Sequence, residues 1–138
     1  MGFSPLELEQ LRRSMAQHVP AHQINTALYE LSSIPTENSI SSFSSARQIN
    51  QKIHFEFVWL FNKYIIDITV GVGISNSLML VSKINYLTKR MIDGKIQLDI
   101  WTGLPGPSVS YEANTEQTKQ MLMNFHGALI RILANGAH

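Results

Sequence analysis

The sequence contains no cysteine, few charged residues and no long apolar run. The missing cysteine excludes disulfides, thiolate zinc sites and cysteine nucleophiles, and it fits a reducing compartment. No apolar run approaches the roughly 18 residues that a membrane-spanning helix needs. We therefore expect a cytoplasmic protein without a transmembrane segment.

Charge is scarce as well as balanced. Charged residues make up 15% of the chain, and 11 basic against 10 acidic residues leave a net charge of +1. Nucleic-acid binding usually needs a basic excess or a basic stripe, so no nucleic-acid partner is predicted. A weakly charged surface repels its own copies little, which favours a homo-oligomer or a protein partner.

The apolar content and the length indicate one folded domain. Hydrophobic residues make up 44% of the 138 residues, which is enough for a core, and the length is close to the common domain size. We expect a single α+β domain over residues 1–138. Its parts are a helical hairpin at 3–35, a serine-rich connector at 36–50, and a sheet with a C-terminal helix at 51–138.

The N-terminal helical hairpin is marked by proline and by helical spacing of apolar residues. Pro5 suits a first helical position, and Pro20 and Pro35 end the two helices. The apolar stripes of the two helices are Leu8, Leu11, Met15 and Val19, followed by Ile24, Leu28 and Leu31.

The connector at 36–50 is rich in serine, which is a poor helix former because its hydroxyl competes for backbone groups. A linker is one interpretation of this segment. The other is a short helix, because Ile40, Phe43 and Ala46 recur near helical spacing.

Two β-hairpins are predicted after the connector. In the first, every second residue from Phe55 to Phe61 is aromatic, and the alternation resumes at Tyr64. The glycine-rich stretch 71–77 is interpreted as a loop, with a buried strand opening at Leu78. In the second hairpin, Asp93-Gly94 predicts a two-residue turn, because a type I′ turn needs positive φ at both positions.

A short edge strand at 108–111 and the best-marked helix of the chain complete the pattern. Asn114 or Thr115 caps the helix, and Asn135-Gly136 ends it. We expect its apolar stripe to pack on the aromatic row, since these are the largest one-sided apolar surfaces. The stripe is Leu122, Phe125, Leu129 and Ile132, and the row is Phe55, Phe57 and Trp59.

These elements predict a five-stranded antiparallel sheet, built from two hairpins plus an edge strand, with helices packed on it. No motif identifies a family. At fold level the sheet followed by a terminal helix resembles PH-like domains, and it is similar to small secretion chaperones that dimerise. Both resemblances imply binding rather than catalysis. PH-like domains have about seven strands, two more than the pattern predicts.

Candidate catalytic and metal-binding residues are few. His18 and His22 have the spacing of a helical metal site, but Pro20 between them breaks the helix. No serine lies in a nucleophile motif. Glu56, Asp67 and Asp99 are interpreted as solvated carboxylates on the polar faces of strands. The sequence predicts no cofactor, no metal and no catalytic residue.

The candidate binding site lies on the polar face of the second hairpin. The Asp93-Gly94 register places Tyr86 opposite Trp101. Tyr, Trp and Arg are the residue types that anchor protein interfaces. The pair is either covered by the N-terminal helices or is a partner surface centred on Trp101. The predicted site residues are Tyr86, Arg90, Lys95, Asp99 and Trp101.

The function expected from these features is a non-enzymatic protein-binding or assembly module. It would act as a homodimer, or as a subunit or chaperone of a larger complex. The alternative is a small enzyme or small-ligand-binding domain with a site between the sheet and the helices.

Overall fold

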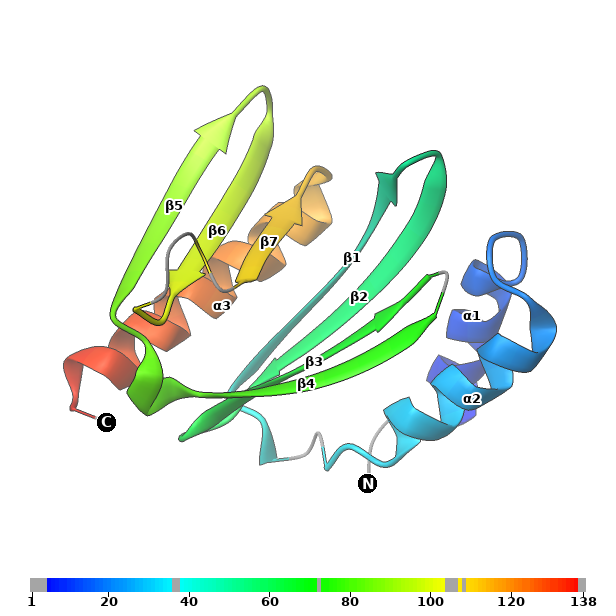
Figure 1. Ribbon diagram of the computed structural model, residues 1–138, viewed down its shortest axis with the longest axis horizontal. Coiled ribbons are helices and arrows are strands. Elements are labelled where there is room, and N and C mark those ends of the chain that lie inside the picture. Colours follow the sequence, from blue (N-terminus) through cyan, green and yellow to red (C-terminus); the bar gives the residue numbers. More distant parts are fainter. Residues whose placement is uncertain (1–4, 36–37, 72, 104–106, 108, 137–138) are drawn as a thin grey trace.

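The structure is a computed structural model that describes residues 5–35, 38–71, 73–103, 107 and 109–136. Helices α1 and α2 precede seven strands, and helix α3 follows them (Figure 1). The bounds are α1 Pro5–Met15, α2 Ala21–Ser32, β1 Ser41–Ile49, β2 Lys52–Leu60, β3 Tyr64–Val70, β4 Ile74–Leu80, a 3₁₀ turn η2 Val81–Lys83, β5 Tyr86–Ile92, β6 Lys95–Trp101, β7 Val109–Ala113 and α3 Glu116–Ala134.

The strands form two antiparallel sheets, in the order β1-β2-β3-β4 and β5-β6-β7. Both predicted hairpins are present: β2 pairs with β3, and β5 pairs with β6. Asp93 and Gly94 have φ of 51° and 76°, as the turn requires. The α+β class is confirmed. A single five-stranded sheet is wrong, because the structure adds β1 and divides the strand predicted to open at Leu78 into β4 and β5, which belong to different sheets.

Strand β1 lies in the segment that was expected to be a connector or a short helix. It pairs with β2 from Ser41 opposite Leu60 to Ile49 opposite Lys52. Backbone pairing with a neighbouring strand overrides the weak local preference of serine. The turn uses Asn50 and Gln51, with φ of 52° and 68°, and this pair is a weaker turn signal than Asn-Gly.

Strand β4 begins inside the stretch that was interpreted as a loop. The amide of Gly71 donates to the carbonyl of Gly73, and pairing with β3 starts at Ile74. The side chains of Ser75 to Ser77 are exposed. Polar residues suit β4 because it is the end strand of its sheet, which is why it lacks an apolar pattern.

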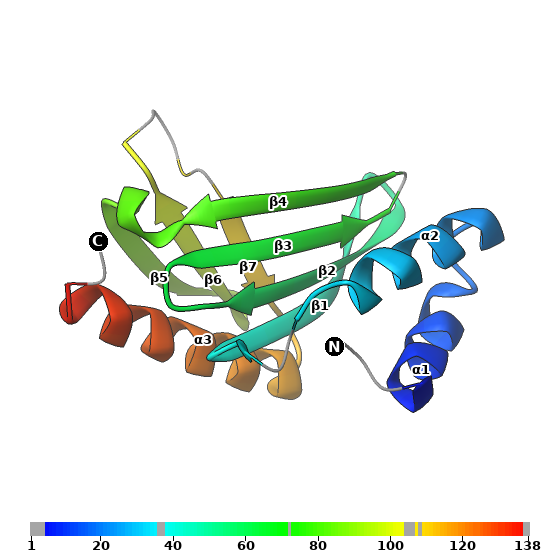
Figure 2. The ribbon, with the colours of Figure 1, turned by 90° about the horizontal axis from the view of Figure 1, so that it is seen from below.

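The inner core lies between the two sheets and α3. Figure 1 shows β5–β7 and α3 on one side of the four-stranded sheet, and α1 with α2 on the other. Helix α3 runs along β1 and reaches β6 and β7 (Figure 2). The buried residues of the inner core are Phe43, Val58, Leu60, Ile65, Val81, Ile96, Leu98, Ile100, Tyr111, Ala113, Leu122, Phe125, Ala128, Leu129 and Ile132.

The outer core lies between α1, α2 and the opposite face of the four-stranded sheet. The aromatic row of β2 is buried there, against apolar residues of the two helices and of the segments that follow them. The predicted packing of α3 on this row is therefore wrong. The buried residues of the outer core are Met15, Val19, Ile24, Ala27, Leu28, Leu31, Ile34, Phe55, Phe57, Trp59, Phe61, Ile68 and Val70.

Strand β2 explains how both cores form. Its side chains alternate between the two faces, and every residue from Phe55 to Leu60 is buried. Val58 and Leu60 face the inner core beside Phe43 of β1, and Phe43 lies against Phe125 of α3, with ring centroids 6.3 Å apart. The even-numbered apolar residues of β2 thus share a core with α3, and the odd-numbered residues share a core with α1 and α2.

Among the described residues, no helix combines the length and the apolar character needed to cross a membrane.

Candidate functional site

The structure brings Tyr86 and Trp101 together as the register predicts. They are opposite one another in the β5–β6 ladder, and their rings meet edge to face with centroids 5.6 Å apart. Tyr86 is 57% exposed, while Trp101 is half-buried. The indole Nε1 of Trp101 is buried and has no hydrogen-bond partner.

Arg90 and Asp99 also meet, in a network on the same face of the sheet. Nη2 of Arg90 lies 3.1 Å from Oδ2 of Asp99, and Oδ1 accepts from Gln97 at 3.0 Å and from Ser110 at 2.6 Å. Burial alone would raise the pKa of Asp99, but the hydrogen bonds from Ser110 and Gln97 and the charge of Arg90 lower it. Asp99 is 3% exposed, so its interpretation as a solvated carboxylate is wrong.

Lys95 stands apart from that network. Its Nζ lies 3.5 Å from Oε1 of Glu112 on β7. Lys95 and Asp99 therefore belong to separate ion pairs on the three-stranded sheet, and both pairs tie β6 to its neighbours.

The predicted cover of the Tyr86–Trp101 pair by the N-terminal helices is wrong. Those helices bury their stripes in the outer core, on the far side of the four-stranded sheet (Figure 1). The aromatic row of β2 is a larger apolar surface than the single pair. Packing α1 and α2 on the row therefore buries more apolar area.

A groove of about 540 Å³ lies between the start of β5 and the C-terminal half of α3. His126 is part of its lining, and burial followed by the nearby charge of Lys89 lowers the pKa of this residue. Tyr86 belongs to this groove as well as to the aromatic pair. The groove is lined by Ser82, Ile84, Asn85, Tyr86, Leu87, His126, Ile130 and Leu133.

Two exposed apolar side chains, Tyr86 and Ile130, line this groove, and others lie elsewhere on the same two elements. Half of the large apolar side chains that are exposed among the described residues lie on β5 or α3. They are Tyr86, Met91, Ile92, Met123 and Ile130. Sequence reasoning missed this surface, although Met123 and Ile130 are seven residues apart and so share a second face of α3.

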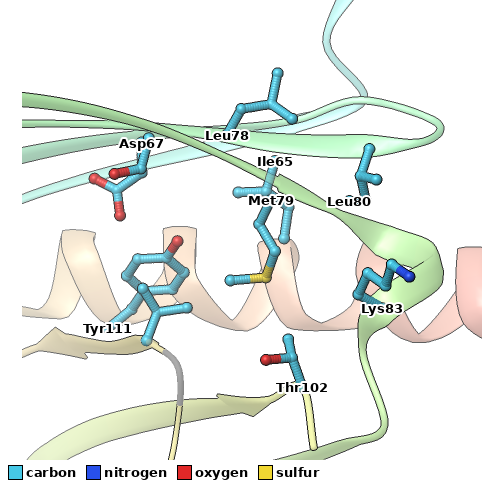
Figure 3. A pocket seen from close by; sticks show the side chains of 10 residues that line it. Ile65, Asp67, Leu78, Met79, Leu80, Lys83, Thr102 and Tyr111 are labelled. Carbon is cyan, nitrogen blue, oxygen red and sulfur yellow. The ribbon is translucent and has the colours of Figure 1, made fainter. Parts of the chain in front are cut away.

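A second cavity of about 510 Å³ lies between the two sheets (Figure 3). Strands β3 and β4 form one wall, and Thr102, Val109 and Tyr111 form the facing wall. Figure 3 shows the hydroxyl of Tyr111 facing the carboxyl group of Asp67, with Met79 in the middle and Lys83 toward the other end. The lining is Ile65, Asp67, Ser77, Leu78, Met79, Leu80, Lys83, Thr102, Val109 and Tyr111.

Asp67 belongs to a buried acid pair with Glu56 of β2, so the interpretation of both as solvated carboxylates is wrong. Glu56 is 6% exposed and Asp67 is 9% exposed. Burial, followed by the charge of Asp67, raises the pKa of Glu56 to about 7, and Arg47 opposes this rise. Burial also raises the pKa of Asp67.

Hydrogen bonds tie this pair to both sheets. Asp67 is hydrogen-bonded to Glu56, to the hydroxyl of Tyr111 on β7, and to Oγ1 of Thr69 at 3.3 Å. Burial, together with the charges of Asp67 and Glu56, raises the pKa of Tyr111 well above its usual range, so this phenol stays protonated and donates. One oxygen of Glu56, Oε1, is buried without a hydrogen-bond partner.

The His18 ring lies beside Phe55, with centroids 6.1 Å apart. In the part of the chain that the structure describes, no group of three His, Cys, Asp or Glu side chains is placed to hold a metal ion.

Comparisons with protein-family models, with curated proteins and with solved structures find no match for this chain.

Proposed function

We propose that the chain is a non-enzymatic protein-binding module that takes an extended segment of a partner protein along the free edge of β5. Side chains of that segment enter the groove between β5 and α3. The observation that carries the proposal is a groove beside an end strand whose lining includes two exposed apolar side chains, Tyr86 and Ile130.

The backbone of β5 supplies the affinity in this mode of recognition. An end strand presents a row of unpaired amides and carbonyls, and an extended peptide pairs with them as an added strand. The ladder with β6 occupies only one edge of β5, because β5 is the first strand of its sheet. Pockets for alternate side chains of the peptide then provide specificity.

The groove supplies these pockets. Tyr86 and Ile130 are 57% and 44% exposed, and they lie on the two sides of the groove. A large aromatic ring and an aliphatic side chain left in water gain several tens of Å² of burial each when a partner covers them. Arg90 of the predicted site lies on β5 itself, where it forms an ion pair with Asp99 of β6.

The partner is a segment of another protein, which suits a subunit or a chaperone of a larger complex. A second copy of the chain offers the same β5 edge, and two such edges pair in antiparallel fashion in a symmetric dimer.

A display library of random linear peptides tests the proposal. We expect the full chain to select peptides with alternating apolar residues, and these peptides should slow amide exchange in β5. Ile130→Asp should weaken binding by about tenfold or more, because a carboxylate is then buried against apolar peptide side chains. Leu6→Asp is the matched control, since Leu6 is 68% exposed on α1, far from the groove.

Sedimentation of the unliganded chain separates the two kinds of partner. A concentration-dependent dimer that Ile130→Asp dissociates identifies a second copy as the occupant. If no peptide is selected and the chain stays monomeric, or if Leu6→Asp weakens binding as much as Ile130→Asp, the proposal is wrong.

A further inference from the structure

Strand β4 presents an open edge at one end of the four-stranded sheet (Figure 2). Among the described elements, β3 is the main contact of β4, whereas β1, at the other end of the sheet, lies along α3. None of the side chains from Ile74 to Leu80 is buried. An edge of this kind is a template for pairing with another strand.

Two hydrogen bonds at the ends of the β3–β4 hairpin show which way the backbone of β4 points. The amide of Gly71 donates to the carbonyl of Gly73 at 2.8 Å, and the amide of Val81 donates to the carbonyl of Lys63 at 2.9 Å. Hydrogen-bonded and non-hydrogen-bonded pairs alternate along an antiparallel ladder, so the odd-numbered residues of β4 bond to β3. The amides and carbonyls of the even-numbered residues in 74–80 therefore point to the open edge.

These outward-facing residues are arranged symmetrically about Ser77. A two-fold axis at Ser77 sets residue 76 opposite residue 78 of a second copy, and residue 74 opposite residue 80. All outward-facing backbone groups of both strands then find partners. A shift of this register by two residues would leave end residues unpaired, and a shift by one would set outward-facing groups against groups that already bond to β3.

The charge along this edge favours a second copy as the partner. Among the end strands of the two described sheets, β4 alone contains no charged residue, whereas β1, β5 and β7 each carry at least one. Glu30 of α2 approaches β4 through Asn76, with its Oε2 3.5 Å from the Nδ2 of the amide. Like charges directly opposite one another destabilise a strand pair, and two β4 strands bring none into their ladder.

An exposed apolar row lies beside the same edge. Leu78 and Leu80 are 60% and 46% exposed, and pairing with β3 sets them beside Ile66 and Tyr64, on the face that borders the outer core. In the symmetric pair, Leu80 lies opposite Ile74 of the second copy, and the two Leu78 side chains are diagonal neighbours across the axis. Pairing therefore removes apolar area of the leucines of both copies from water.

We propose that β4 pairs in antiparallel fashion with β4 of a second copy, across a two-fold axis at Ser77, so that the two four-stranded sheets become one continuous sheet. One strand from each copy makes a small interface, which gives a weak, concentration-dependent dimer. The β5–α3 groove belongs to the other sheet, so either proposal stands if the other fails.

Cysteine cross-linking tests the position of the axis, because the chain has no cysteine of its own. In Ser77→Cys, the two thiols lie in a non-hydrogen-bonded pair with Cα atoms about 4.5 Å apart, which suits a disulfide. Ser75→Cys is the matched control, since Ser75 is also an exposed serine of β4, but its two copies are about 13 Å apart along the strands. We expect mild oxidation to link Ser77→Cys about tenfold faster or more. Equal rates, or no link in Ser77→Cys, overturn the proposal.

Sedimentation of the full chain measures the association itself. We expect a monomer–dimer equilibrium whose dissociation constant rises about tenfold or more in Leu78→Lys, because lysines then replace the apolar contact across the axis. Leu6→Lys on α1, at a side chain that is 68% exposed, should leave the constant unchanged. Ile130→Asp should leave it unchanged too, which distinguishes this dimer from one formed through the groove. A chain that stays monomeric at about 1 mM, or a dimer that depends on Ile130 and not on Leu78, overturns the proposal.

Discussion

Glu56 is the residue whose environment departs most from that of an ordinary strand carboxylate. Its pKa of about 7 exceeds the unfolded value of 4.5, so the folded state binds more protons between these values. The contribution of Glu56 to stability is therefore full below the unfolded pKa and is lost as the pH rises through the folded one. The shift corresponds to about 3 kcal/mol.

Glu56→Gln tests this linkage. The free energy of unfolding of the variant, minus that of the wild type, should rise by about 3 kcal/mol between roughly pH 5 and pH 8. Taking the difference removes His126 and the other titrating groups that do not interact with Glu56, whereas Asp67 is coupled to Glu56 and contributes to the difference. Urea unfolding at a series of pH values measures it, and a difference that does not change with pH would contradict the assignment.

A substitution at Gly94 tests how backbone conformation alone affects stability. A Cβ at Gly94 or at Gly73 meets no atom within 4 Å, but only Gly94 has a positive φ, of 76°. Gly94→Val should therefore lower the free energy of unfolding by roughly 1 kcal/mol or more, whereas Gly73→Val should change it by less. Thermal unfolding of both variants measures the difference. Equal losses of stability would contradict the claim that the positive φ of Gly94 causes the effect.

At the residue scale, the sequence predicts what is local. Asp93-Gly94 fixes its turn through its own dihedral angles, and the Tyr86–Trp101 contact follows by counting from that turn. The burial of Glu56 and Asp67 depends on β1 and on Tyr111, which is distant in the sequence. No spacing in the chain indicates that contact. The sequence alone therefore predicts that the carboxyl groups of Glu56 and Asp67 are solvated.

At the element scale, the helices were predictable, β1 was not, and only the end of β4 from Leu78 onward was predicted as strand. Thr115 caps α3 in a capping box with Thr118, and Asn135 ends the helix. Strand β1 and the first half of β4 are rich in polar residues and lie at the two ends of their sheet, so no apolar alternation indicates them. Without β1, the aromatic row is the largest apolar surface that the sequence offers α3, although Ile96, Leu98 and Ile100 of β6 are the residues that share its core.

Phe125 tests where α3 packs. It is fully buried, against Phe43 and Tyr111, with ring centroids 6.3 Å and 6.0 Å away. Phe125→Ala should cost about 3–5 kcal/mol through lost burial and the cavity it leaves. Met123→Ala on an exposed face of the same helix is the control and should cost less than about 1 kcal/mol. Chemical denaturation measures both, and a small loss at Phe125 would place α3 elsewhere.

At the scale of the whole molecule, one sheet separates two cores, and each side carries one tryptophan. Trp59 is 4% exposed in the outer core, and Trp101 is half-buried on the three-stranded sheet. Trp59→Ala should cost about 3–5 kcal/mol, and Trp101→Ala should cost clearly less. Denaturant titration measures the two losses of stability. A larger loss for Trp101→Ala would mean that the face of the three-stranded sheet that carries Trp101 is buried.

The same pair offers an optical test. Trp59→Phe leaves Trp101 as the only indole, and Trp101→Phe leaves Trp59. Acrylamide should quench the emission of the Trp59→Phe variant more strongly, because Trp101 is the more accessible ring. Equal quenching constants for the two folded variants would contradict the placement of α1 and α2 over Trp59.

Helix α3 packs along β1, yet it follows all seven strands in the chain. A ribosome therefore delivers the serine-rich strand and its hairpin partner long before their cover exists. Until α3 is synthesised, Phe43, Val58 and Leu60 stay exposed to water. The two N-terminal helices can already cover the aromatic row on the other face of the sheet. The inner core thus closes after the outer one, and the four-stranded sheet is most prone to aggregation between its own synthesis and that of α3.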